Sequence, residues 1–140
     1  MLNNSKRIVP TALNIGIKEV RGDIVIRIDA HSIYPSNYIE KLVLWIRESK
    51  TDNVGGICIT KPGAETAIAR AIAVILSHPF GVGNGLFRIG IKEPKYVDTV
   101  PFGAYRREVF NTIGLFNERL IRNQDLEFNL RLKKLEAKFF

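Results

Sequence analysis

Hydrophobic positions recur along the chain with two periods, which together predict alternating helices and strands. Residues 10–20 are predicted to form a helix, because Leu13, Ile17 and Val20 fall on one face. Residues 23–29 follow as a nearly continuous β-branched run. Such a run is typical of a strand that is buried on both faces of a largely parallel sheet. The beginning of the chain therefore predicts a helix followed by a buried strand.

The rest of the pattern continues this alternation. The next helix is expected to be capped by Ser36, with an apolar stripe at Ile39, Leu42, Val43 and Ile46. The elements expected after it are, in order, a strand at 53–60, a helix at 64–77, a long loop at 78–95, a strand at 96–102, helices at 106–113 and 123–134, and the start of a strand at 137–140. The helix at 64–77 is expected to turn Ile68, Ile72 and Ile75 toward the core. Strands that alternate with helices indicate an α/β layer fold.

Length and chain ends bear on domain organisation. A chain of 140 residues is expected to be one domain or part of a larger one. It begins at the approach to a helix and stops on the apolar pair Phe139-Phe140. We therefore expect residues 1–140 to be the middle of a larger domain.

Charge narrows the choice of partners. The chain has 21 Lys and Arg against 14 Asp and Glu, which gives a net charge of +7. A basic balance favours anionic partners such as phosphates, nucleic acid or acidic lipid, without choosing among them. The single cysteine, Cys58, lies among Gly and Ile residues and is expected to be a buried, inert thiol. The N-terminus lacks the apolar core of a signal peptide and the longest apolar run, 71–76, is too short to span a bilayer, so we expect a cytoplasmic domain.

Asp29 and His31 are the first candidate site residues. Asp29 stands at the carboxyl end of the predicted buried strand and His31 lies just beyond it. In open α/β sheets this is the edge where ligands bind. A carboxylate and an imidazole in one turn can both reach a divalent ion, which would steady a phosphate leaving group. The alternative is that Asp29 caps the turn and His31 is an exposed loop residue.

Asp125 and Glu127 form the second candidate. Asn123 is a reasonable N-cap, which places both carboxylates in or near the first turn of a helix. The helix dipole alone explains carboxylates there. The functional alternative makes Asp125 a general base, because an ionised carboxylate can accept a proton from an activated hydroxyl.

The third candidate is the stretch 97–107, in which a predicted strand runs into a Pro/Gly turn and then a helix. Gly103 could let a ligand approach the backbone closely. Arg106 or Arg107 could hold an anion, and the alternative is a solvated basic face.

Taken together and in this order, these features resemble a family-2 glycosyltransferase of the GT-A fold, of the bacterial exopolysaccharide-biosynthesis type. The stretches that carry the resemblance are ALNIGI (12–17) with RGD (21–23), DAH (29–31), VDTVPFGA (97–104) with RREVF (106–110), IGLFNE (113–118) and QDLE (124–127). The resemblance implies a three-layer αβα, GT-A-like mixed sheet of the nucleotide-diphospho-sugar transferase kind, incomplete at both ends.

The resemblance also implies roles for single residues on the donor side. Asp29 would bind the nucleotide sugar and its metal, and His31 stands where a metal-ligating carboxylate is usual. Asn14 and Arg21 would lie near the nucleotide. The cofactor expected is a divalent metal, and imidazole suits Mn²⁺ better than Mg²⁺.

On the acceptor side, the resemblance makes Asp125 the base that deprotonates the acceptor hydroxyl. Glu127 would help to shape the acceptor site, and Gly103 and Arg106 belong to the acceptor-side stretch. The implied reaction is an inverting transfer from a nucleotide-diphosphate sugar to a saccharide or lipid-linked saccharide in polysaccharide biosynthesis.

Expectations about partners follow from the same resemblance. The family's first strand and helix are absent before Met1, so we expect weak or no activity of this chain alone. An open sheet edge would favour a homo-oligomer, and membrane association would come only through parts outside the chain. One alternative is a non-catalytic oligomerising fragment. The other is a basic nucleic-acid-binding module, which the dispersed positive charges disfavour, so we expect no nucleic acid partner.

Overall fold

The computed structural model describes residues 2–140, which form two compact units. The first unit comprises the chain up to Gly55 together with Tyr96–Phe140, and the second comprises Gly56–Lys95. Both hydrophobic cores and the sheet belong to the first unit. All the site residues predicted from the sequence also lie in the first unit.

The sheet of the first unit has three short strands in the order β1-β3-β2. Both outer strands pair antiparallel with β3, so that Val25 and Asn53 lie opposite Tyr105 on its two sides. Phe139 adds a parallel bridge to Asn53, which makes the pairing mixed and confirms strand structure near the C-terminus. The expectation of a largely parallel sheet around the first strand is wrong, because β3 lies between β1 and β2 and runs against both. The strands are β1 (Ile24–Ile26), β2 (Asn53–Val54) and β3 (Ala104–Arg106).

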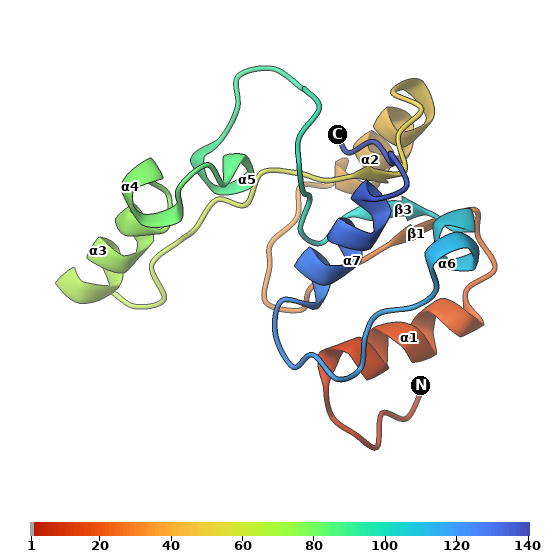
Figure 1. Cartoon of the computed structure of the whole chain (residues 1–140). Helices are drawn as coiled ribbons and strands as arrows, with labels where there is room; N and C mark the ends of the chain where they lie inside the picture. Colours follow the sequence, from red (N-terminus) through yellow and green to blue (C-terminus); the bar gives the residue numbers. More distant parts are fainter. Residues whose placement is uncertain (1) are drawn as a thin grey trace. The chain divides into compact units, whose positions relative to one another are not determined.

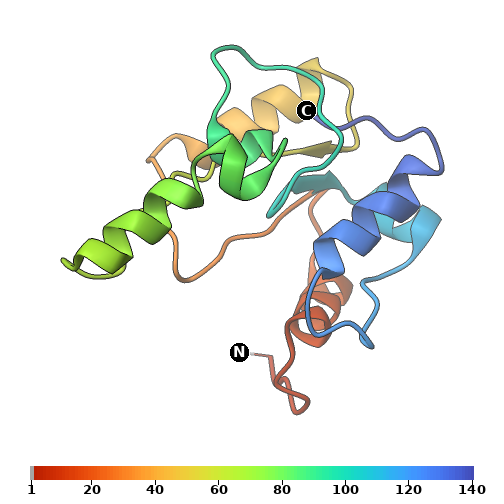
Figure 2. The same cartoon turned by 60° about the vertical axis from the view of Figure 1, so that its left-hand side comes forward.

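Helices pack on both faces of this sheet (Figures 1 and 2). Successive side chains of a strand point to opposite faces of the sheet, so the strands contribute side chains to the cores on both faces. Ala104 and Val54 pack in the core beneath α2, whereas Tyr105 and Val25 pack in the core on the other face. The predicted three-layer α/β arrangement is therefore confirmed. The helices are α1 (Val9–Glu19), α6 (Glu108–Ile113) and α7 (Gln124–Lys133) on one face and α2 (Tyr38–Glu48) on the other.

An aromatic cluster attaches α7 to its face of the sheet. Phe128 of α7 is fully buried, and its ring centroid lies 5.5, 5.4 and 4.4 Å from those of Tyr105, Phe110 and Phe116. Aromatic pairs at such distances add to the free energy gained by burial alone. This packing fixes α7, and with it the Asp125 side chain in its first turn.

Several predicted boundaries in the first unit are wrong. The strand expected at 23–29 is reduced to β1, and the helix expected at 106–113 begins only at Glu108, because Arg106 ends β3. Ser36 does not cap the second helix: Asn37 occupies the N-cap position and makes no side-chain cap hydrogen bond. The predicted strand at 96–102 is reduced to one bridge at Val97, and the strand proper begins only at Ala104. Phe102 has φ of 50°, a left-handed conformation that a strand cannot contain, so the turn displaces the strand.

The second unit contains three helices and differs most from expectation. The predicted inner face of α3 is 74%, 52% and 52% exposed at Ile68, Ile72 and Ile75, and Ala73 is the helix's one buried residue. Within its own unit α3 packs chiefly against a helix of four residues, Pro79–Val82, which is too short to cover that face. The helices are α3 (Ala67–Ile75), α4 (Pro79–Val82) and α5 (Leu86–Ile89), the last two within the expected long loop.

Two further expectations concern the second unit. Cys58 is only partly buried, and burial still raises the pKa of its thiol, which agrees with an inert side chain. The strand expected at 53–60 ends at Val54. Beyond it the Gly55 backbone N–H donates to the Phe140 carbonyl at 2.9 Å, and residues 56–60 form no strand. Over residues 2–140, none of the helices has the length and apolar character that a membrane span requires.

Candidate active site

The candidate site lies where β1 ends, beside the turn that precedes β3 and the beginning of α7. Arg27 directly follows β1, Phe102 and Gly103 directly precede β3, and Asp125 lies in the first turn of α7. The backbone N–H of Arg27 donates to the Gly103 carbonyl at 3.3 Å. Pairing between the two strands therefore continues as far as the site, and three distant segments of the chain meet there.

Arg27 and Asp125 form the central ion pair of the site. Arg27 Nη1 donates to Asp125 Oδ1 at 2.6 Å and to Oδ2 at 2.8 Å. The two side chains are only 14% and 20% exposed. The guanidinium also lies over the Phe102 ring, with Cζ 4.6 Å from its centroid. Short charged hydrogen bonds and a cation–π contact together hold the pair in one geometry.

Asp29 and His31 form a turn just beyond Arg27. The Asp29 backbone N–H donates to Tyr34 Oη at 2.8 Å, which anchors the turn. Asp29 Oδ1 accepts from the His31 backbone N–H at 3.4 Å and lies 3.4 Å from His31 Nδ1. The side chains of Asp29 and His31 are 32% and 95% exposed. Asp29 therefore does cap its turn, and both side chains remain open to a cation.

Asp125 lies in an electrostatic environment set by several neighbours. Burial raises the pKa of Asp125 above its usual value and is the largest effect. The charge and hydrogen bonds of Arg27 lower that pKa, whereas the negative charge of Asp29 raises it. A carboxylate of raised pKa is a stronger base. The structure thus brings Asp29 and Asp125, which the sequence places far apart, within electrostatic reach of each other.

Tyr105 is the buried neighbour of this pair. Burial and the negative charge of Asp125 raise its pKa, and Arg27 opposes the shift. The Asn53 side chain also opposes it, although Tyr105 Oη and Asn53 Oδ1 have no partner of hydrogen-bond geometry among residues 2–140. Tyr105 therefore stays neutral at physiological pH and leaves the charge of the site to Arg27, Asp29 and Asp125.

Two residues next to the ion pair adopt left-handed backbone conformations without being glycine. Phe102, under the Arg27 guanidinium, has φ of 50°, and Asn123, just before α7, has φ of 60°. Such conformations are enriched at functional sites. Asn123 occupies the predicted N-cap position, but its side chain makes no cap hydrogen bond. Gly103 is required for packing, because a Cβ there would overlap the Asn53 amide, and its acceptor-side role stays a prediction.

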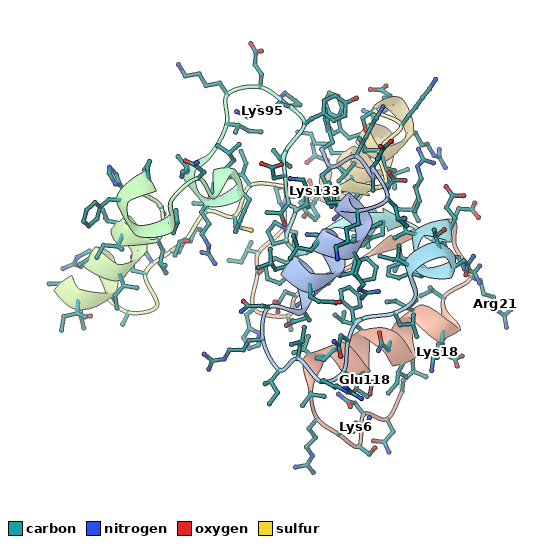
Figure 3. The ribbon with its side chains drawn as sticks, viewed as in Figure 1. Lys6, Lys18, Arg21, Lys95, Glu118 and Lys133 are labelled. Atoms are coloured by element: carbon teal, nitrogen blue, oxygen red, sulfur yellow. The ribbon has the colours of Figure 1, made fainter. Side chains whose placement is uncertain are left out.

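The two predicted nucleotide-side residues on or after α1 lie elsewhere. Asn14 is buried, and its side-chain amide both donates to and accepts from the backbone of Phe116. These hydrogen bonds join α1 to the segment between α6 and α7. Arg21 lies in the exposed segment after α1 and its side chain points outward (Figure 3). The structure does not bring either side chain to the Arg27–Asp125 pair.

Arg106 and Glu127 also make structural contacts. Arg106 donates from Nε to the Thr51 carbonyl and from Nη2 to the Ile46 carbonyl at the end of α2, on the opposite face of the sheet from α7. Glu127 is paired with Arg131 one turn along α7, at 2.7 Å. Glu127 therefore shares the helix of Asp125, whereas Arg106 lies apart from it.

Sequence reasoning missed Arg27, Tyr34 and Phe102. A signal existed for Arg27, since a lone charge in an otherwise β-branched run needs a partner once the strand is covered on both faces. Tyr34 and Phe102 gave no comparable signal, because their roles depend on a turn and on a backbone conformation.

A divalent cation fits this site only in part. Asp29 Oδ1 and His31 Nδ1 can both turn to one ion. Within the described chain, no group of three or more His, Cys, Asp or Glu side chains could hold a metal ion. The protein would therefore supply two ligands, and phosphate oxygens and water would have to supply the rest, a common arrangement for cations at phosphate sites.

Comparison with known proteins identifies the family. Residues 2–114 match the family described as "Glycosyl transferase family 2". The chain is 31% identical over 135 residues to the "Succinoglycan biosynthesis protein ExoA" of Rhizobium meliloti (strain 1021), covering 95% of this chain and 40% of that protein. It is 32% identical over 143 residues to the "Dolichyl N-acetyl-alpha-D-glucosaminyl phosphate 3-beta-D-2,3-diacetamido-2,3-dideoxy-beta-D-glucuronosyltransferase" of Methanococcus voltae, covering 98% of this chain and 43% of that protein.

The chain thus spans about two fifths of the length of the curated relatives that it matches. The family match covers β1, the Asp29–His31 turn and β3, and it ends before α7 and Asp125. The layered α/β structure agrees with the GT-A fold of the matched family. The chain therefore belongs to glycosyl transferase family 2.

Proposed function

We propose that the protein transfers a sugar from a nucleotide-diphosphate donor to an acceptor hydroxyl with inversion at the anomeric carbon. The observation that carries the proposal is the convergence of Asp29 and Asp125 at one edge of the sheet, with Arg27 paired to Asp125. Asp29 is the donor-side group and Asp125 the acceptor-side base. Inversion by a single displacement needs one base on the acceptor side, in contrast to glycoside hydrolysis, which usually uses two carboxylates.

In the proposed reaction, Asp125 accepts the proton of the acceptor hydroxyl as its oxygen forms a bond to the anomeric carbon. The bond from that carbon to the diphosphate oxygen breaks, and the nucleoside diphosphate leaves with the electron pair. Asp29 and His31 would hold a Mn²⁺ or Mg²⁺ ion, which supplies charge compensation for the departing diphosphate. The raised pKa of Asp125 favours proton acceptance.

The acceptor class is supported by the relatives rather than by the geometry. One relative is named for succinoglycan biosynthesis, and the name of the other includes a dolichyl sugar phosphate. We therefore propose a saccharide or a lipid-linked saccharide as the acceptor, within polysaccharide or glycan assembly.

Nucleotide binding tests the donor half of the proposal. UDP and GDP would be titrated calorimetrically into the wild type, Asp29→Ala and Asp98→Ala, each with and without Mn²⁺. Asp98 is an exposed aspartate paired with Lys133, so its variant is matched for charge. We expect Mn²⁺-dependent binding that Asp29→Ala weakens at least about tenfold and Asp98→Ala preserves. Equal weakening in both variants, or no binding at all, would contradict the donor site.

Asp125→Asn tests the acceptor half. The expected weak activity of this chain alone sets the reference. Because removal of a general base costs about 10²–10⁴-fold in rate, whatever transfer the wild type shows should fall by that factor while nucleotide affinity is retained. Joint loss of nucleotide affinity and transfer would place Asp125 on the donor side instead.

A further inference from the structure

We propose that Arg27 is a positioning residue, whose guanidinium fixes the orientation in which the Asp125 carboxylate accepts the acceptor's proton. The inference rests on the function proposed above and adds a residue that lies outside the motifs carrying the family resemblance.

The hydrogen bonds leave Asp125 free to react. A carboxylate offers about four lone-pair sites, and Arg27 Nη1 takes one on each oxygen, at 2.6 and 2.8 Å. The remaining sites stay available to an acceptor hydroxyl, and Asp125 retains a partly exposed surface. Arg27 therefore restricts rotation of the carboxylate without covering it.

The position of Arg27 is itself fixed. Its backbone N–H bonds to the Gly103 carbonyl, and its guanidinium lies over the Phe102 ring. Phe102 presents that ring from a left-handed conformation, and Asn123 in the same conformation leads into the turn of α7 that carries Asp125. Asparagine adopts this conformation readily, so of the two residues beside the pair Phe102 is the strained one, and that strain holds its ring under the guanidinium.

Arg131, which lies on the same helix as Asp125, is an arginine whose contacts are structural. Arg131 pairs with Glu127 and lies over Phe128, but it also donates to the carbonyls of Ile113 and Leu115, joining α7 to the end of α6. The Arg27 side chain, within the described chain, hydrogen-bonds only to Asp125. Since a poorly hydrated ion pair is weak evidence for stability, the single partner of Arg27 indicates a role exerted through Asp125.

Titration of Asp125 shows whether Arg27 acts on this carboxyl in solution, and the separate effects on kcat and KM show whether that contact matters to the reaction. The groups that act on this carboxyl are Arg27 after β1, Asp29 in the following turn and Tyr105 of β3. The whole chain would be labelled with ¹³C at aspartate carboxyls, and the Asp125 signal assigned by its loss in Asp125→Asn. The wild type would be compared with Arg27→Gln, Arg27→Lys and the matched control Arg131→Gln.

We expect Arg27→Gln to raise the midpoint of the Asp125 titration by about 1–3 pH units, since a neighbouring arginine lowers an aspartate pKa by that amount. Arg27→Lys keeps the charge but loses the planar guanidinium that lies over the Phe102 ring, so it should give a smaller shift and should not restore transfer. Arg131→Gln should leave the Asp125 titration unchanged. In the transfer assay, Arg27→Gln should lower kcat with little change in the donor KM.

An Asp125 midpoint that is the same in Arg27→Gln and the wild type would overturn the proposal. So would full recovery of transfer in Arg27→Lys, because a point charge would then suffice. If Arg27→Gln does not fold, the Asp125 titration of Arg27→Lys is the test, and a midpoint equal to that of the wild type would overturn the proposal. Nucleotide titration on the same samples distinguishes failure of this proposal from failure of the proposed function. No nucleotide binding by the wild type would contradict the donor site, whereas an unshifted Asp125 titration would contradict the role of Arg27.

Discussion

Asn14 and Phe116 are joined by two reciprocal hydrogen bonds. Asn14 Nδ2 donates to the Phe116 carbonyl at 2.9 Å, and the Phe116 backbone N–H donates to Asn14 Oδ1 at 2.9 Å. The Asn14 side-chain amide thus donates to and accepts from one residue's backbone, as a paired residue does in an antiparallel sheet. It ties α1 to the turn between α6 and α7, two segments that the sequence separates widely.

Asn14→Ala should therefore destabilise the fold before it affects any ligand. The substitution leaves the buried N–H and carbonyl of Phe116 without partners, and each such group costs about 1–3 kcal/mol. Urea unfolding measures the loss. Asn111→Ala, on the exposed face of α6, is the matched control and should stay within about 0.5 kcal/mol of the wild type. If Asn14→Ala unfolds like the wild type but loses nucleotide affinity, the nucleotide-side role is correct instead.

Glu118 should give the fold a distinct acid sensitivity. A hydrogen bond from Lys6 is the largest cause, and one from Asn14 adds to it, so that the pKa of Glu118 falls from 4.5 to about 2 (Figure 3). Since the folded pKa is depressed, this stabilisation is present above pH 4.5 and is lost as the pH falls toward 2. Glu118→Gln should therefore unfold with a shallower pH dependence in that window.

The partner of Glu118 gives a second check of this acid sensitivity. Lys6→Met should also flatten the pH dependence of unfolding, because it removes the main donor to Glu118. Lys18→Met removes an equal charge from the exposed side of α1 and should leave the profile as in the wild type (Figure 3). Identical profiles for both lysine variants would show that net charge, rather than the Lys6–Glu118 pair, sets the acid sensitivity.

His31 should make the site prefer Mn²⁺ to Mg²⁺. Imidazole binds Mn²⁺ more readily than Mg²⁺, which favours oxygen ligands. His31→Asp is therefore expected to narrow the difference in nucleotide affinity between the two ions. His78→Asp is the control, because His78 caps α4 in the second unit and aspartate is a good N-cap there. An unchanged metal preference in His31→Asp would remove His31 from the metal site.

Gly103 should tolerate no side chain. A Cβ would overlap the Asn53 amide, which itself donates to Asn129 of α7, so Gly103→Ala should cost about 1–3 kcal/mol. Gly16→Ala is the matched control: nothing lies within 4 Å of its would-be Cβ. Alanine in the middle of α1 should stabilise by about 0.5–1 kcal/mol. Thermal unfolding of both variants measures the contrast, and equal melting temperatures would contradict the packing described.

Sequence periodicity predicted the helices of the first unit well. Helix α1 and helix α7 follow their predicted ranges to within one residue at each end, because their faces meet a core on one side only. The strands were harder, since antiparallel pairing by β3 depends on contacts between residues far apart in the chain. The apolar face of α3 was placed in a core by its pattern alone, and the pattern does not specify whether a partner surface exists.

For the site, motif order predicted Asp29 and Asp125 as candidates but not how they are arranged. Their proximity depends on where α7 docks, which the ring of Phe128 fixes through contacts invisible in the local sequence. Arg106 shows the reverse case. It belongs to a stretch that the sequence predicted to be part of the site, yet its side chain bonds to the end of α2, because side chains along a strand alternate between the two faces of the sheet.

The place of β3 between β1 and β2 also has a consequence for synthesis. As this stretch emerges from the ribosome, β1 and β2 are made before β3, the strand that pairs with both of them. Pairings between distant residues slow folding, and unpaired strand edges invite association in the meantime. The pairing of β1 and β2 with β3 is therefore expected to form only after the entire second unit, Gly56–Lys95, has been made.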